Sequence, residues 1–167
     1  MARPSVGALA LLLSLTLGAA VTTGVTGVTA ARGDPLGNVR AVKLSMPALS
    51  EAAEPCGLDR AALEAAFFKP LAQRGIEAVA SGTGYRLFLR AVTIGYLEET
   101  CVSYIEAQLL LTTRYQDAAN QQERSGHVLL WSDGQLLASD AREHATTLEH
   151  GMLKLGSALA ARWDLAN

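Results

Sequence analysis

The chain has 167 residues, half of them hydrophobic and 18% charged, and its formal net charge is −2. A charge so close to zero does not favour nucleic acid or an anionic membrane surface as a partner. The length is sufficient for one ordinary domain with a packed core.

The first 30 residues predict export from the cytoplasm. A short basic stretch, Met1 to Pro4, precedes an uncharged Leu- and Ala-rich run from Val6 to Val21, and small residues follow. This order is typical of a signal peptide, and the run is shorter than the roughly 20 residues of a membrane-spanning helix. We expect cleavage after Ala30, with Ala20 as the second possibility and an uncleaved N-terminal anchor as the alternative.

The rest of the chain is expected to form one exported domain. Residues 1–30 would be the signal peptide, and residues 31–38 a linker, because they are rich in Pro, Gly and Asn. Residues 39–167 would then be a single domain in the periplasm or outside the cell, with no membrane span after cleavage.

The two cysteines, Cys56 and Cys101, both lie in the exported part. In an oxidising compartment two cysteines most often form one disulfide, so we expect the pair to be bonded. The bridge would close a loop of roughly 45 residues and contribute about 4 kcal/mol on the chain-entropy model.

The first half of the domain predicts two strands around one helix. Period-2 alternation over 39–46 predicts the first strand, and a short second strand is expected over 76–80. Between them, Asp59 is the expected N-cap of a helix that ends at Arg74–Gly75 and contains Pro70 near its end. Its apolar face would consist of Ala62, Leu63, Ala66, Phe67 and Leu71.

Two long apolar segments, 85–97 and 101–115, predict a β-hairpin with a three-residue loop over 98–100. A slip by one residue would place Leu89 against Gln108, which a buried face would not tolerate. The predicted pairs are all apolar or small: Leu97 with Cys101, Thr93 with Ile105, Ala91 with Ala107, Leu89 with Leu109, and Leu87 with Leu111.

The segment after the hairpin is expected to start with a mobile loop. Residues 116–125 are polar and without periodicity, and 127–131 predicts another strand. Asp133–Gly134 is the signal of a tight turn, after which 135–138 would return as a short strand.

The last helix has the clearest pattern. Asp140 and Glu143 form a capping box, and the helix continues toward Trp163. Its apolar stripe is Ala141, Ala145, Leu148, Met152, Leu155 and Leu159. The element order β-α-β-β-β-α predicts an α+β fold, with a mostly antiparallel sheet of four to five strands and two helices on one face.

Several short motifs resemble a group of small, uncharacterised exported proteins of Gram-negative bacteria. They are Cys56-Gly57-Leu58, Arg74-Gly75-Ile76 at the end of a helix, the hairpin with Cys101, Trp131-Ser132, and a final helix that stops at Ala166-Asn167. The resemblance covers most of the exported part. It implies an address in the cell envelope and the same α+β plan, and it implies no activity.

No motif predicts catalysis, a metal or a cofactor. The three histidines are His127, His144 and His150. His144 and His150 would lie about 240° apart around one helix, so they cannot face the same metal ion, and neither matches a His-Glu-x-x-His motif. Ser81–Gly84 is rich in glycine but is not followed by the lysine and helix of a phosphate-binding loop. We therefore expect no catalytic residues, metal site or cofactor.

The second face of the hairpin predicts a binding surface. In the predicted register it pairs Phe88 with Leu110, Ile94 with Tyr104, and Tyr96 with Val102, which is more apolar than a solvated sheet needs. Alternatively, the 116–125 loop or a homodimer partner covers it. The candidate binding residues are Arg86, Phe88, Arg90, Ile94, Tyr96, Tyr104, Glu106, Gln108, Leu110 and Arg114.

These features predict a small binding or accessory module. Its partner would be an envelope protein or a small apolar ligand, and a homodimer is compatible with the same surface. The alternative is an enzyme of an unrecognised type, which would require a concave pocket where several titratable groups converge.

Overall fold

The computed structural model describes residues 34–97 and 99–167, with only the backbone for Tyr96 and Leu97. The expected signal peptide and both of its expected cleavage sites lie outside these residues. The described part has an α+β fold, as predicted from the order of its elements.

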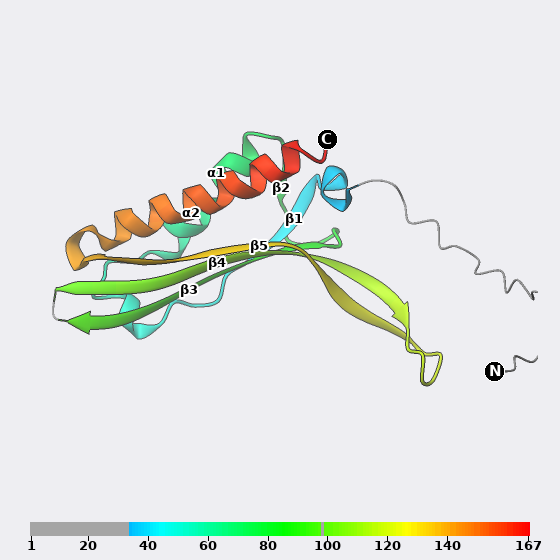
Figure 1. The fold of residues 1–167 in the computed structure, drawn as a ribbon, viewed down its shortest axis with the longest axis horizontal. Helices are drawn as coiled ribbons and strands as arrows, with labels where there is room; N and C mark the ends of the chain where they lie inside the picture. Colours follow the sequence, from blue (N-terminus) through cyan, green and yellow to red (C-terminus); the bar gives the residue numbers. More distant parts are fainter. Residues whose placement is uncertain (1–33, 98) are drawn as a thin grey trace, which may run out of the picture. The chain divides into compact units, whose positions relative to one another are not determined.

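A five-stranded sheet is the central element, with the strand order β2-β1-β3-β4-β5. The pairing of β1 with β2 and with β3 is parallel, whereas β3–β4 and β4–β5 are antiparallel. Both helices lie on the same side of the sheet (Figure 1). The bounds are β1 (Ala41–Ser45), α1 (Arg60–Ala72), β2 (Glu77–Ala78), β3 (Tyr85–Leu97), β4 (Thr100–Gln116), β5 (Glu123–Asp140) and α2 (Ala141–Asp164).

Helix α1 begins where its sequence predicts. The carboxylate of Asp59 accepts hydrogen bonds from the backbone N–H groups of Ala61 and Ala62, which have no partner inside the helix. Gly75, at φ 75°, follows the last turn, and this backbone conformation favours glycine. Pro70 is buried within the helix.

Helix α2 is capped by Asp140, which accepts a hydrogen bond from the backbone N–H of Arg142. Gly156 faces α1 so closely that a Cβ there would overlap the carbonyl oxygen of Phe67. The absence of a side chain at Gly156 therefore permits the two helices to pack together.

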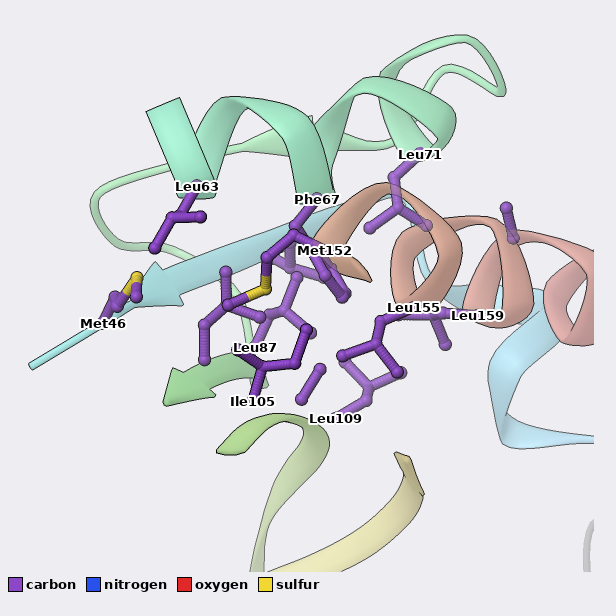
Figure 2. Packing of buried hydrophobic residues seen from close by; sticks show 14 of the residues in the cluster. Met46, Leu63, Phe67, Leu71, Leu87, Ile105, Leu109, Met152, Leu155 and Leu159 are labelled. Atoms are coloured by element: carbon purple, nitrogen blue, oxygen red, sulfur yellow. The ribbon is translucent and has the colours of Figure 1, made fainter. Parts of the chain in front are cut away.

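The core fills the space between the two helices and the facing side of the sheet. Phe67 of α1, Ile105 of β4 and Met152 of α2 are all 0% exposed. Figure 2 shows their side chains converging with those of neighbouring leucines. The surrounding buried residues include Leu63, Leu71, Leu87, Leu109, Leu155 and Leu159.

A disulfide joins Cys56 to Cys101, as predicted. The Cα atoms are 6.1 Å apart, within the usual range for a disulfide. Both cysteines are buried, at 1% and 4% exposure. The bond attaches the segment before α1 to the start of β4, next to the β3–β4 turn.

The end of the expected linker belongs to the folded unit instead. Pro35–Asn38 forms a short 3₁₀-helix, η1, whose Leu36 is 1% exposed. Asp34 forms an ion pair with Arg162 of α2 at 2.6 Å. The Pro and Gly residues of this segment therefore form a packed turn, because an adjacent apolar side chain is buried in the core.

The β3–β4 register differs from the predicted one by two residues. Leu87 pairs with Leu109 rather than Leu111, and a register shift between Gly95 and Leu97 precedes the turn. The described side chains nevertheless lie on their predicted faces, because a shift of two residues preserves the alternation of a strand. In the observed register Leu89 pairs with Ala107, so keeping Gln108 off the buried face is compatible with both registers.

A buried polar pair accounts for the observed register. Thr93 pairs with Ser103, and their hydroxyl oxygens are 2.8 Å apart. The predicted register would have placed Thr93 opposite Ile105 and left its buried hydroxyl without this partner.

The predicted mobile loop over 116–125 is wrong in extent, and so are the two short strands after it. Strand β4 continues to Gln116, and β5 is one continuous strand from Glu123 to Asp140. Only the connection between Gln116 and Glu123 is a loop, and the polar residues beyond it pair in the ladder. The polar sequence of 116–125 therefore reflects the exposure of a two-stranded ribbon to solvent rather than an absence of secondary structure.

The predicted tight turn at Asp133–Gly134 is also wrong. Gly134 lies inside β5, opposite Glu106. A Cβ at Gly134 would be 2.7 Å from the hydroxyl oxygen of Tyr104 and 3.0 Å from the carbonyl oxygen of Ile105. The glycine therefore permits the close approach of a neighbouring tyrosine, which is a second common role of glycine in a strand.

Candidate functional site

The side of the sheet opposite the helices is not covered by any element of the described chain, and we call it the open face. The strand register arranges its side chains in rows that run across β3, β4 and β5. Two rows are apolar: Val92, Tyr104 and Leu136 in one, and Ile94, Val102 and Ala138 in the next. We call these six residues the apolar patch.

Four large side chains of the apolar patch are exposed. The exposed fractions are 41% for Val92, 61% for Ile94, 37% for Tyr104 and 69% for Leu136. They come from three adjacent strands and therefore form one continuous surface. An isolated exposed leucine is ordinary, whereas a contiguous apolar group of this kind is informative.

A polar row borders the apolar patch. Arg90 forms an ion pair with Glu106 at 2.9 Å, and the other carboxylate oxygen of Glu106 accepts a hydrogen bond from Gln108 at 2.7 Å. The guanidinium of Arg90 also lies 5.7 Å from the ring centre of Tyr104. These contacts fix the orientation of charged groups at the edge of an apolar surface.

Tyr104 lies at the centre of this arrangement. Its ring contacts the guanidinium of Arg90, and its hydroxyl reaches over the space left by Gly134. The ring is therefore held across the sheet while more than a third of the residue remains exposed. A tyrosine fixed in this way loses little conformational entropy when a partner binds.

The open face contains most of the predicted binding residues. Their cross-strand pairs differ from the predicted ones: Phe88 pairs with Gln108, and Ile94 with Val102. Tyr96 lies in β3, and its side chain is outside the described part. The residues that the structure places on this face are Arg86, Phe88, Arg90, Ile94, Tyr104, Glu106, Gln108 and Leu110. Their role in binding stays a prediction.

Arg114 lies away from the others. It belongs to the part of β4 that extends beyond β3, where it pairs with Ser125. Its guanidinium forms an ion pair with Glu123 at 3.4 Å. This ribbon of β4 and β5 is separate from the apolar patch, so Arg114 does not border it as predicted.

The contribution of β5 was not predicted from the sequence. Leu136 and Ala138 complete both apolar rows, whereas the sequence predicted only a short return strand over 135–138 after a turn and did not place these two residues beside Tyr104 and Val102. No local pattern marks 123–140 as one strand, because Leu136 and Leu137 are both apolar and Asp133–Gly134 is typical of a turn.

A buried hydroxyl and imidazole cluster lies on the opposite side of the sheet. His144 is 0% exposed, and its Nε2 and Nδ1 atoms are each 2.8 Å from a serine hydroxyl, that of Ser103 and that of Ser139. Burial lowers the pKa of His144 below its ordinary value, because desolvation disfavours the charged imidazolium. Ser103 is also 0% exposed, so this serine and histidine pair cannot reach a substrate and is a structural cluster.

An open groove of about 380 Å³ lies between α1 and α2. Its titratable groups are Lys69, Glu149 and His150, and its remaining walls are three alanines and Leu153. The three titratable groups form no ion pair or hydrogen bond with one another in the described structure.

Within residues 34–97 and 99–167, no group of three or more His, Cys, Asp or Glu residues is placed to hold a metal ion. Across the same residues, no helix combines the length and the apolar character that crossing a membrane would require.

Comparisons with known proteins reveal only distant likenesses. No family model matches the chain, and no curated protein matches it. A PelC dodecamer from Paraburkholderia phytofirmans is 17% identical, with a TM-score of 0.41, over 79% of this chain and 90% of that one. A minor lipoprotein from Acinetobacter baumannii is 10% identical, with a TM-score of 0.39, over 75% and 91%.

A lipoprotein from Caulobacter crescentus CB15 is 14% identical, with a TM-score of 0.28, over 74% of this chain and 85% of that one. Two of these three proteins are thus named as lipoproteins. Likenesses of this degree carry no conclusion about what this chain binds or does.

Proposed function

We propose that this chain is a small exported accessory module that binds an envelope protein or a small apolar ligand through the apolar patch. The observation that carries the proposal is the exposure of Val92, Ile94, Tyr104 and Leu136 on one continuous surface. Contiguous exposed apolar groups commonly mark interaction sites.

The composition of the site supports binding by a partner with an apolar contact surface. Tyrosine and arginine are enriched among the residues that dominate the energy of interfaces, and here Tyr104 and Arg90 are in contact. The ion pair of Arg90 with Glu106 supplies a polar border to an apolar centre. This is the usual anatomy of a protein interface.

The loop after β4, which is the alternative cover for the open face, lies at the far end of the strand from the apolar patch. It connects Gln116 to Glu123, whereas the apolar patch surrounds Tyr104 near the other end of β4. At ~3.3 Å per residue, the strand between Tyr104 and the loop spans about 40 Å. A short connection cannot return over that distance.

Export is supported by two independent features. The N-terminal order of a basic stretch, an apolar run and small residues is typical of a signal peptide. The disulfide between Cys56 and Cys101 fits an oxidising compartment. Intact-mass analysis of periplasmic protein should therefore show a chain that begins at Ala31 or Val21, and a full-length chain in the membrane fraction would contradict this.

Site-specific photo-crosslinking tests the binding surface. A photoreactive amino acid at Ile94 should form a discrete adduct in the envelope of a producing Gram-negative cell, because this side chain is 61% exposed within the patch. Leu165, which is 81% exposed beyond the end of α2, is the matched control position. Adducts should form at Ile94 and not at Leu165.

The variant Tyr104→Ser should abolish the adduct at Ile94 without unfolding the protein, because the side chain contributes to the patch and not to the core. Native mass spectrometry of the purified protein distinguishes a small apolar ligand from a protein partner. Identical adduct patterns at Ile94 and Leu165, or an adduct that persists in Tyr104→Ser, would refute the proposed function.

A further inference from the structure

Strand β5 forms one edge of the sheet and pairs only with β4. It extends from Glu123 to Asp140, whereas the strand at the opposite edge, β2, has two residues. An edge strand of this length presents a row of backbone N–H and C=O groups that can pair with another strand. The β5 edge can therefore pair with a long strand of another chain, whereas the β2 edge can pair over two residues only.

One hydrogen bond identifies the groups that point outward from β5. The backbone N–H of Gly134 donates to the carboxylate of its neighbour Asp133 at 2.8 Å, so it does not point toward β4. The backbone N–H and C=O groups of successive residues in a strand point to opposite edges. The groups of Leu136 and Ala138, two and four residues after Gly134, therefore point outward as well. Among the described residues, no hydrogen bond to the outward backbone groups of Leu136 and Ala138 is present.

The segment Gln135–Ser139 has none of the features that usually protect an edge strand. It contains no charged residue and no proline, and the β-bulge of the β4–β5 ladder lies elsewhere, next to Leu109 and Leu110. Leu136 in its centre is 69% exposed. Natural edge strands commonly carry lysine, proline or a bulge at such positions to prevent pairing with another chain.

We propose that a second copy of this chain pairs with the β5 edge, antiparallel about a two-fold axis at Leu136. In this register the backbone of Leu136 pairs with that of Leu136 in the second copy, and Ala138 pairs with Gly134. Both members of each pair have outward-pointing groups, as an antiparallel ladder requires.

Two observations favour a second copy in this isologous arrangement. A head-to-tail contact between β5 and β2 could form only a two-residue ladder, because β2 consists of Glu77–Ala78. Pairing of β5 with itself matches a long edge with an equally long edge, and Gln135–Ser139 at its centre carries no charge that would repel its own copy; the nearest charges are Asp133 and Asp140. Closed two-fold dimers are also the commonest form of homo-oligomer.

The proposal is independent of the proposed function of the open face. Strand pairing takes place in the plane of the sheet, so it leaves the apolar patch uncovered. It also brings the Leu136 side chains of the two copies together. The two open faces would then form one larger surface with two copies of Tyr104.

Removing the side chain of Asp133 should increase the affinity of the dimer. Its carboxylate occupies the outward N–H of Gly134, which the second copy needs for its Ala138 carbonyl. The variant Asp133→Ala frees this donor and removes a negative charge from each side of the interface. The dissociation constant should fall by about tenfold, which corresponds to ~1.4 kcal/mol.

Two variants should weaken the dimer. Leu136→Lys places like charges next to the two-fold axis, and Ala138→Pro removes an outward N–H while the bonds to β4 are retained. Each should raise the dissociation constant by about tenfold or more, which is ~1.4 kcal/mol. Leu165→Lys is the matched surface control and should have no effect. Analytical ultracentrifugation over a concentration series measures all four variants, and thermal melting verifies that each is folded.

Cysteine crosslinking tests the register. The native cysteines are bonded to each other, so Leu136→Cys introduces a single thiol, which should form an intermolecular disulfide under mild oxidation. Ile94→Cys, at a position that is 61% exposed compared with 69% for Leu136 but lies two strands from the edge, should not. A protein that stays monomeric throughout the concentration series would overturn the proposal. So would a dimer that is unaffected by Asp133→Ala and Ala138→Pro but lost in both Tyr104→Ser and Leu136→Lys, because it would use the open face, to which Tyr104 and Leu136 both belong.

Discussion

The two faces of strands β3 and β4 carry similar apolar side chains and bury them to opposite extents. Leu87 and Leu89 on the helix face are 0% exposed, whereas Val92 and Ile94 on the open face of the same strand are 41% and 61% exposed. The apolar stripes of α1 and α2 cover the first face, and no described element covers the second. Because stabilisation follows the area removed from water, the side chains of the helix face contribute most to the stability of the fold and those of the open face contribute little.

The largest expected effect comes from truncating the same residue type on each face. Ile105→Ala removes a fully buried side chain from the core and should lower the free energy of unfolding by about 2–5 kcal/mol. Ile94→Ala should change it by less than ~0.5 kcal/mol, because its side chain is mostly in water. Urea denaturation of the two variants measures the difference. Equal losses would mean that the open face is part of a core, and the binding proposal would be wrong.

The difference between the two faces could be predicted from the sequence, although the pairing could not. Alternation with a period of two assigned Leu87 and Ile105 to one face and Ile94 to the other, whichever register the hairpin adopts. The register itself depends on the buried cluster of Thr93, Ser103 and His144, whose members come from three elements. No pattern within one strand reveals such a cluster.

The role of β5 was beyond sequence reasoning for a similar reason. An Asp-Gly pair between apolar segments is typical of a tight turn, and only the neighbouring Tyr104 explains a glycine inside a strand at position 134. The helices were predictable because their caps and apolar periodicity are local. The face of the β3 and β4 residues of the apolar patch was thus predictable, whereas the contribution of Leu136 and Ala138 required the three-dimensional arrangement.

The next effect concerns the disulfide that holds the helix face of β4 to the segment before α1. Cys101→Ser should lower the free energy of unfolding by about 2–4 kcal/mol, because the unfolded chain gains the freedom of an open loop. Thermal melting of this variant and of Cys56→Ser should give similar losses. Two free thiols in the natively purified protein would contradict the bond itself.

A smaller effect is expected from pH, and it also originates on the helix face. The folded pKa of His144 is lowered by burial, so below about pH 6.5 the unfolded chain binds a proton that the folded protein does not. The free energy of unfolding should therefore decrease as the pH falls from 7 toward ~5. His144→Gln should remove this dependence, whereas His150→Gln, at an exposed position of the same helix, should leave it unchanged. Identical slopes for both variants would show that other groups control the acid response.

The smallest effect on stability, and the sharpest test of the open face, comes from two glycines of β5 that each adjoin a tyrosine of β4. A Cβ at Gly134 would be 2.7 Å from the Tyr104 hydroxyl, and a Cβ at Gly126 would be 3.0 Å from the Tyr115 ring. Either Gly→Ala change should alter the free energy of unfolding by less than ~1 kcal/mol, because the gain from a more rigid unfolded chain opposes the local crowding. Gly134→Ala should nevertheless reduce photo-crosslinking at Ile94, because it displaces the tyrosine at the centre of the apolar patch. Gly126→Ala displaces a tyrosine of the distant ribbon and should not. A reduction of crosslinking by both variants would attribute the effect to β5 as a whole and would contradict a binding site centred on Tyr104.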